Sequence, residues 1–252
     1  MTPDQEQPIG VPKEEFLDSV RQALGRGPTP GPAPECPQLK ETVAELEARA
    51  REAERRNSKD RKALASRFLE TAKLRGWKVH RASNAEDALV CLSSIVTSLN
   101  VDRAVRSDQE VFQGLPLDPA LAGLGISVTT IARDEEHTRE VLREEIVAAG
   151  VGITGADYAV AETGSVVVLP RKGLSRLVSL VPPVHIAVVR AQEIVESLDD
   201  IFLLRRLHYH RNGGDMGSYL NFISGPSRTA DIEQTLVVGV HGPKEVHLVL
   251  LG

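Results

Sequence analysis

The spacing of the hydrophobic residues changes about a third of the way along the chain. In residues 14–24 and 39–75 the apolar side chains recur every three or four positions, which predicts a short N-terminal helix and a long second helix. Between them, residues 25–37 contain five prolines and three glycines, and this composition predicts a linker or an extended arm. We therefore predict an N-terminal region of residues 1–38 and a main domain of residues 39–252.

Beyond residue 76, short apolar runs alternate with amphipathic segments. Apolar runs that predict β-strands lie at 77–80, 101–106, 126–130, 151–154, 165–169, 184–189, 219–223 and 246–250. Helical spacing lies at 85–99, 135–149 and 191–207. Several of the apolar runs are rich in valine, which is typical of strands buried on both faces. The alternation predicts an α/β domain with a Rossmann-like, mostly parallel sheet flanked by helices.

Composition limits the classes of function. The chain has 252 residues, of which 41% are hydrophobic and 26% are charged, as in a soluble globular domain with an appendage. Its net charge of −5 and its 4% of aromatic residues argue against nucleic acid as a partner. No apolar run is long enough for a membrane span, and residues 1–10 lack the features of a signal peptide. We therefore expect a cytoplasmic protein.

Potential metal ligands are few. The two cysteines, Cys36 and Cys91, are far apart and not in a CxxC motif, so the chain lacks the four cysteines of a self-contained zinc or iron–sulfur site. His208, His210 and Asp215 are the nearest approach to a metal-binding set, but no further strong ligand stands at a recognisable spacing. We expect neither a metal nor another cofactor in this chain.

The segment Ser224–Glu233, with the sequence SGPSRTADIE, combines a tight turn with hydroxyl groups and a guanidinium. A Gly-Pro pair predicts the turn, and the residues that follow predict a helix N-terminus, whose free amides and dipole suit a phosphate or carboxylate. Arg228 adds a planar donor for oxyanions. Two interpretations stay open: a helix start capped by Ser227 or Thr229, or an anion-binding site.

A second polar cluster, AETGS at residues 161–165, leads directly into a valine-rich run. Glu162 could act as a base or nucleophile or bind a substrate hydroxyl, and Gly164 would allow close approach. The alternative is a β-turn whose polar side chains bond their own backbone. His185 lies in another apolar run and is either a hydrogen-bonded core histidine or a buried group that reaches the same pocket as Glu162.

Four motifs occur in order along the chain: ADYAVAETG at 156–164, PPVHI at 182–186, SGPSRTADIE at 224–233 and GVHGP at 239–243. Together they resemble the LUD-domain (lactate-utilization domain) family, and within it the lactate utilization protein C-like members. The resemblance covers residues 40–252. It implies a fold similar to the NagB/RpiA/CoA-transferase-like superfamily.

The resemblance also implies a role in the bacterial oxidation of L-lactate to pyruvate, alongside two partner proteins with iron–sulfur motifs. This chain lacks the cluster-binding cysteines, so iron–sulfur clusters are expected only in the partners. Glu162-Thr-Gly164 is similar to a short Glu-x-Gly element of CoA-transferases, in which the glutamate is the nucleophile. A stand-alone enzyme acting on CoA esters, nucleotides or sugar phosphates and a pure assembly module are the alternatives.

We predict that the polar clusters form one pocket. In open α/β sheets ligands gather beyond the carboxyl ends of the strands, where both turns would lie, with His185 on an intervening strand. Arg228 and the helix amides would hold a small anionic ligand, while Glu162 or His185 would face a substrate hydroxyl or its proton. The predicted ligand-binding residues are Thr163, Gly164, Ser165, Ser224, Gly225, Ser227, Arg228 and Thr229, and the candidate catalytic residues are Glu162 and His185.

Overall fold

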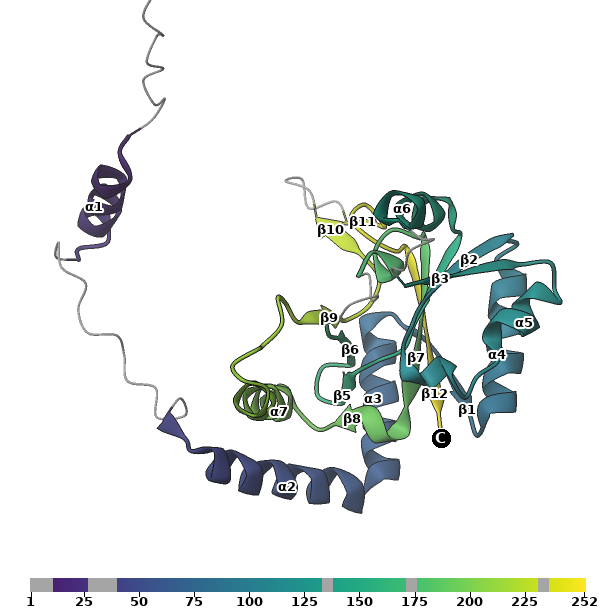
Figure 1. Ribbon diagram of the computed structural model, residues 1–252, viewed down its shortest axis with the longest axis horizontal. Helices are drawn as coiled ribbons and strands as arrows, with labels where there is room; N and C mark the ends of the chain where they lie inside the picture. Colours follow the sequence, from purple (N-terminus) through teal and green to yellow (C-terminus); the bar gives the residue numbers. More distant parts are fainter. Residues whose placement is uncertain (1–10, 27–39, 133–137, 171–175, 231–235) are drawn as a thin grey trace, which may run out of the picture. The chain divides into compact units, whose positions relative to one another are not determined.

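A computed structural model of the protein describes residues 11–26, 40–132, 138–170, 176–230 and 236–252 (Figure 1). The chain forms two compact units, Met1–Thr42 and Val43–Gly252. The described part of the first unit contains helix α1 (Lys13–Ala23), which confirms the predicted N-terminal helix. Apolar side chains of α1, including Phe16 and Val20, are exposed.

The second unit is built on a six-stranded, fully parallel sheet with the strand order β1-β12-β7-β4-β2-β3. Its strands are β1 (Lys78–Ala82), β2 (Arg103–Ser107), β3 (Ser127–Ile131), β4 (Val151–Thr154), β7 (Val184–Arg190) and β12 (Glu245–Leu251). All of β4 and nearly all of β7 are buried, as their valine-rich sequences predict. The prediction of a mostly parallel α/β sheet flanked by helices is confirmed.

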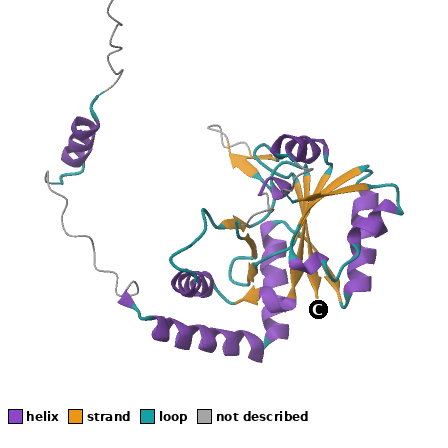
Figure 2. Ribbon diagram, in the orientation of Figure 1, coloured by secondary structure: helices purple, strands orange, loops and turns teal. Residues whose placement is uncertain are grey.

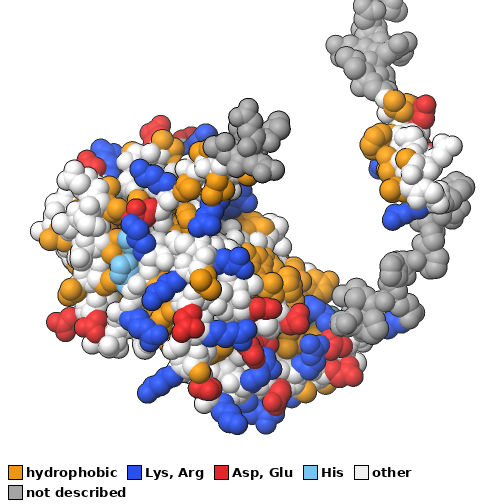
Figure 3. Space-filling view, turned by 180° about the vertical axis from the view of Figure 1, so that it is seen from behind, with side chains coloured by type: hydrophobic (Ala, Val, Ile, Leu, Met, Phe, Trp, Pro, Cys, Tyr) orange, Lys and Arg blue, Asp and Glu red, His pale blue; other side chains and the backbone are white. Residues whose placement is uncertain are grey.

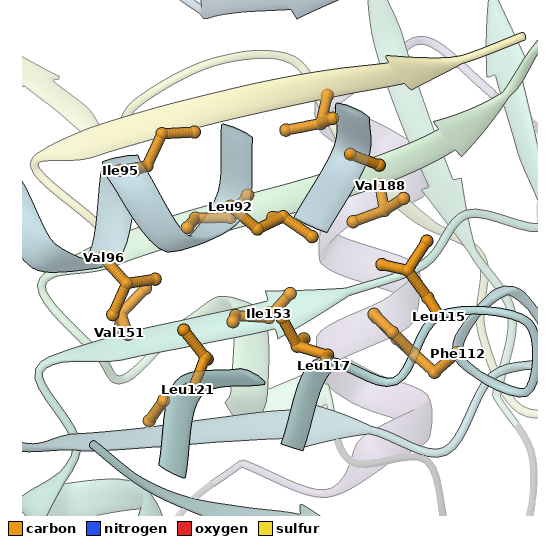
Figure 4. Close-up of a cluster of buried hydrophobic side chains, with 14 of the residues drawn as sticks. Leu92, Ile95, Val96, Phe112, Leu115, Leu117, Leu121, Val151, Ile153 and Val188 are labelled. Carbon is orange, nitrogen blue, oxygen red and sulfur yellow. The ribbon is translucent and has the colours of Figure 1, made fainter. Parts of the chain in front are cut away.

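Helices cover both faces of this sheet (Figure 2). On one face lie α4 (Ala85–Ser98), α5 (Leu117–Ala122) and the 3-10 helix η2 (Glu110–Phe112). On the other face lie α3 (Arg61–Arg75), α6 (Arg139–Ala148) and the 3-10 helix η3 (Arg176–Ser179). Figure 4 shows the core beneath α4 and α5, where Leu92, Leu121 and Ile153 are fully buried. The helices thereby exclude water from both faces of the parallel strands.

A smaller, four-stranded sheet shares a core with α3 and the main sheet. Its order is β8-β5-β6-β9, from β8 (Ile194–Val195), β5 (Tyr158–Val160), β6 (Ser165–Val168) and β9 (Asn221–Ile223). Helix α7 (Leu198–Arg211) covers its other face, and α2 (Val43–Lys59) packs on α7 (Figure 1). The sequence predicts two of these strands but assigns them to a single sheet; the existence of a second sheet is a finding of the structure.

Two predicted helices have different boundaries. The predicted helix 39–75 is two helices, because Asp60 leaves the helical conformation (φ −132°, ψ 48°) between α2 and α3. The predicted helix 191–207 begins instead with the 3-10 helix η4 (Ala191–Glu193) and strand β8. α7 starts only after Ser197, whose side chain caps it. This hydroxyl was the sequence signal for the true helix start.

Ion pairs join α2 to α7. Arg56 donates to the buried carboxylate of Asp200 at 2.7 and 2.9 Å and also to Glu196. The hydrogen bond with Asp200 raises the pKa of Arg56. Arg211 pairs with Glu47 at 2.7 Å. These ion pairs hold α7 in place over the second sheet.

On the face shown in Figure 3, basic and acidic side chains are interspersed over the second unit.

A substitution at Gly164 tests how closely the second sheet approaches α3. Gly164 has φ +67°, and a Cβ added there would lie 2.6 Å from the backbone nitrogen of Ala72. We expect Gly164→Ala to lower the free energy of unfolding by about 3 kcal/mol, because the left-handed backbone is strained and backbone atoms must also move apart. Urea denaturation measures the change.

Gly213 supplies a matched control, since its φ is +64° and an added Cβ would meet no atom within 4 Å. Gly213→Ala should carry only the backbone strain, about 1 kcal/mol. Equal losses of stability in the two variants would contradict the close approach of Gly164 to α3.

Candidate functional site

A cavity of about 520 Å³ opens between α7, the second sheet and the carboxyl end of α3. It is lined by Arg75, Thr163, Ser165, Leu198, Phe202, Phe222, Ser224, Pro226 and Arg228. These residues come from separate segments of the chain, so only the tertiary fold brings them together. Four of the predicted ligand-binding residues are among them: Thr163, Ser165, Ser224 and Arg228.

Three hydroxyl groups form a row in this cavity. Thr163 Oγ1 donates to Ser165 Oγ at 2.8 Å, and Ser165 Oγ lies 2.6 Å from Ser224 Oγ. The antiparallel pairing of β6 with β9 explains the second contact, since it places Val166 opposite Ile223 and so brings the two serines face to face. Because hydroxyls both donate and accept, the row suits carboxylate or phosphate oxygens and a substrate hydroxyl.

Two arginines bring positive charge to the cavity. Arg228 Nη2 donates to the carbonyl oxygen of Arg75 at 3.4 Å, so its guanidinium lies at the carboxyl end of α3, where the helix dipole favours a cation. Among the described residues, neither arginine forms an ion pair, and none of the described lining residues is acidic. The lining therefore carries positive charge that no carboxylate of the described lining neutralises.

The cavity lies at the amino ends of the strands of the main sheet, whereas the sequence predicted a position beyond their carboxyl ends. Ser227 N donates to the carbonyl oxygen of Pro243 at 2.9 Å, just before β12 begins. Arg228 contacts Arg75, just before β1 begins. The prediction that this turn lies beyond the carboxyl ends of the parallel strands is wrong, because the turn follows β9 of the second sheet and meets the amino ends of the main strands.

The predicted helix start within Ser224–Glu233 is also wrong. Arg228–Ala230 form strand β10, which pairs in antiparallel fashion with β11 (Leu236–Val238). Residues 231–233 of the segment lie outside the described residues. With a strand in place of a helix, the donors that this turn offers to an anion are its hydroxyl and guanidinium groups rather than helix amides.

The remaining predicted ligand-binding residues contact other parts of the protein. Ser227 Oγ accepts a hydrogen bond from His241 N at 3.2 Å, and Thr229 lies in β10. Gly164 and Gly225 both approach α3; a Cβ on Gly225 would lie 2.4 Å from the carbonyl oxygen of Arg75. The two glycines are required for close backbone packing, and a role of these four residues in ligand binding stays a prediction.

Glu162 lies at the amino end of α7. Its carboxylate Oε2 accepts a hydrogen bond from the backbone nitrogen of Leu198, the first residue of the helix, at 3.1 Å. An exposed carboxylate in this position satisfies a free helix amide and interacts favourably with the helix dipole. Glu162 borders the cavity through Leu198 but is not part of the lining. Its predicted catalytic role stays a prediction.

His185 is completely buried in β7 and is not part of the cavity lining. Its Nε2 lies 2.9 Å from Thr154 Oγ1, and its ring lies against Trp77 with the ring centroids 6.0 Å apart. Burial lowers the pKa of His185 to about 3, so the ring is neutral at pH 7. This geometry is that of a hydrogen-bonded core histidine, and its predicted catalytic role stays a prediction.

The residues considered as metal ligands lie in and after α7: the helix carries His208 and His210, and Asp215 is in the loop that follows. Within the described ranges, no three His, Cys, Asp or Glu side chains are grouped as a metal site would require. None of the described helices is both long enough and apolar enough to cross a membrane.

Sequence reasoning missed Arg75 and the apolar part of the cavity. Leu198 and Phe202 are one turn apart on α7, and Phe222 lies on β9. One feature of the sequence could have predicted the apolar wall: Phe222 is two residues before Ser224, so in an extended segment both side chains lie on the same face. No local pattern predicts that α7 lies over this strand.

The fold and the cavity define a class of α/β protein in which a parallel sheet shares its core with a second, mixed sheet and a basic, hydroxyl-lined cavity lies beside that second sheet. A family model described as the LUD domain matches residues 65–251, and the chain belongs to this family. The fold is also similar to that of a DUF162 family protein from Deinococcus radiodurans, with a TM-score of 0.50 and 23% identity over 76% of this chain and 98% of that one.

Several similar proteins carry names that refer to lactate. Lactate utilization protein C of Halalkalibacterium halodurans is 46% identical over 110 residues, which are 43% of this chain and 47% of that protein. The protein of the same name from Geobacillus kaustophilus is 30% identical over 201 residues, 69% of this chain and 82% of that protein. Lactate utilization protein B of Shouchella clausii is 26% identical over 223 residues, 70% of this chain and 45% of that protein. The chain thus spans about half the length of the first and third of these relatives.

The buried His185 predicts a pH dependence of stability. Its pKa is lowered from an ordinary 6.5 to about 3, so below pH 6.5 the unfolded chain takes up a proton that the folded chain does not. This contribution to stability is complete above pH 6.5 and is lost as the pH falls from there toward 3. Between pH 7 and pH 4 the loss should be on the order of 3 kcal/mol.

His185→Gln provides the comparison, because glutamine can still bond Thr154 but does not titrate. Urea denaturation at several pH values should show that the free energy of unfolding falls less steeply with decreasing pH in the variant than in the wild type. Parallel declines would mean that His185 is protonated in the folded state, contrary to its burial.

Proposed function

We propose that this chain is the cluster-free subunit of a cytoplasmic iron–sulfur system that oxidises L-lactate to pyruvate in bacteria, and that its cavity binds a small anionic ligand. Similarity to proteins named lactate utilization protein C and B supports the link to lactate. The 252 residues contain too few cysteines to ligate an iron–sulfur cluster with cysteines alone, so the clusters of such a system would belong to partner proteins.

The observation that carries the ligand proposal is the pair of guanidiniums, Arg75 and Arg228, beside the hydroxyl row of the cavity. Neither guanidinium has an ion-pair partner among the described residues. Arginine presents planar, permanently charged donors that match carboxylate and phosphate oxygens. The hydroxyls of Ser165 and Ser224 add neutral donors or acceptors in the same cavity. A carboxylate such as that of lactate or pyruvate satisfies this arrangement.

The size of the cavity favours a second candidate, a stand-alone enzyme acting on CoA esters, nucleotides or sugar phosphates. A volume of about 520 Å³ lies in the range of pockets that hold ligands far larger than a three-carbon acid. The exposed position of Arg75 and Arg228 would also suit a phosphate. A pure assembly module is the remaining alternative, and it requires no ligand.

Deletion and complementation test the proposal. Deleting the gene in its native host should abolish growth on L-lactate, and the wild-type gene should restore it. The double variant Arg75→Gln/Arg228→Gln should fail to restore growth, because each lost charged hydrogen bond costs about 1.5–3 kcal/mol of anion binding. Co-purification of iron–sulfur partners with the tagged wild-type protein is the accompanying measurement.

Arg143→Gln, a charge loss on the exposed surface of α6, is the matched control and should restore growth. Normal growth of the deletion strain on L-lactate would contradict the lactate role. Full activity of the double arginine variant within an intact complex would instead favour the assembly module.

Glu162→Gln separates chemistry from helix capping. The glutamine oxygen can still accept a hydrogen bond from Leu198 N, while the carboxylate is lost. We expect the free energy of unfolding to fall by less than about 1 kcal/mol, as for an exposed helix-end charge. Lactate-dependent growth that persists in this variant would leave Glu162 with the helix-capping role alone. Loss of growth in a variant that keeps its melting temperature would assign Glu162 a chemical role.

A further inference from the structure

We propose that the ligand of this cavity is an organic anion that carries a flat, unsaturated ring, with the ring against Phe202 and Phe222 and the anionic group at Arg75 and Arg228. The inference rests on the proposed anion site and specifies the part of the ligand that the anion site does not hold. It follows from the apolar side of the cavity, which the sequence did not single out.

Two phenylalanines form this apolar side. Phe222 comes from β9 and Phe202 from α7, and their ring centroids are 6.4 Å apart with the ring planes tilted by 40°. Leu198 lies one helical turn before Phe202 and lines the same cavity. Aromatic faces and edges at this separation bind planar, apolar groups well.

Core packing accounts for Phe222 but not for Phe202. Phe222 packs on the cluster of buried residues between α7 and the second sheet. Phe202 keeps 48% of its surface exposed although it belongs to a helix with several buried positions. A large apolar ring held open at the wall of a cavity gains most by covering it with an apolar ligand group.

The two sides of the cavity are placed so that one ligand can reach both. Phe222 and Ser224 are two residues apart on one face of an extended segment, which separates their Cα atoms by about 7 Å. Ser224 is the last member of the hydroxyl row, and Arg228 follows it four residues later and lines the same cavity. A ring joined to a carboxylate or phosphate by a few bonds can contact both sides of the cavity, whereas lactate has no ring to place against the phenylalanines.

Two sources supply this chemistry: a 2-hydroxy or 2-oxo acid with an aromatic side chain, and a phosphate joined to a nucleobase. Matched pairs that differ by the ring distinguish them. L-3-phenyllactate is compared with L-lactate, and adenosine 5′-monophosphate with ribose 5-phosphate, by isothermal titration calorimetry on the full-length protein. In one of the two pairs the ring-bearing member should bind about tenfold more tightly or better.

Substitutions assign the gain to the phenylalanines. Phe202→Ala should remove most of the gain from the ring, while the affinity for the ringless member changes less than about twofold. Phe202→Tyr, which keeps a ring, should retain the gain. Tyr209→Ala is the matched control, since Tyr209 is 40% exposed on the same helix and does not line the cavity. Arg228→Gln should weaken both members of the pair. Melting temperatures check that each variant is folded.

The outcomes separate this inference from the proposed function. Ringless anions that bind, lose affinity in Arg228→Gln and gain nothing from a ring would overturn the inference and leave the anion site intact. A ring effect that is unchanged in Phe202→Ala would also overturn it. Failure of all four compounds to bind would overturn both the inference and the proposed anion site, and growth on lactate tests the lactate role independently of either.

Discussion

The cavity depends on the close approach of the second sheet to helix α3. One face of α3 packs between this sheet and the main sheet, where Phe68 is fully inaccessible to solvent. Gly164 and Gly225 allow the backbone of the second sheet and of its following loop to meet the carboxyl half of α3 without side chains between them. This contact places Ser165, which follows Gly164, and Ser224, which precedes Gly225, in the same cavity as the end of α3. A residue with a side chain in place of either glycine would push the second sheet and α3 apart and so separate the two walls of the cavity.

Electrostatics at the end of α3 then determine what the cavity can hold. The carboxyl end of a helix attracts cations, and the guanidinium of Arg228 lies there against the carbonyl of Arg75. Within the part of the chain that the structure describes, the guanidinium of Arg228 is thus held by a backbone carbonyl rather than by a carboxylate. A guanidinium has five N–H donors, more than this one bond uses. At the other side of the cavity, the amino end of α7 interacts with the carboxylate of Glu162. The proposed anion would therefore meet the arginines and not the Leu198 amide, which Glu162 already occupies.

The parts of the fold that local patterns encode were predictable. Valine-rich runs such as 151–154 and 184–189 indicated buried parallel strands, because only a strand covered on both faces tolerates continuous apolar sequence. The division of the strands into two sheets was not predictable, since strand pairing is a long-range choice that leaves no local mark. The break at Asp60 and the late start of α7 also escaped, because the helical periodicity of the side chains continues across the first and begins before the second.

The candidate site shows the same division. By itself, the sequence determined that the chain is an α/β protein of the LUD-domain family and that the segments around Ser165 and Ser224 bear clustered polar groups, because these depend on residue identity and order. Only the tertiary structure decided that the two serines meet, that Arg75 and two phenylalanines line the same cavity, and that this cavity lies at the amino ends of the main-sheet strands. Those facts follow from the packing of segments far apart in the chain, which the hydrophobic effect drives but the local sequence does not address.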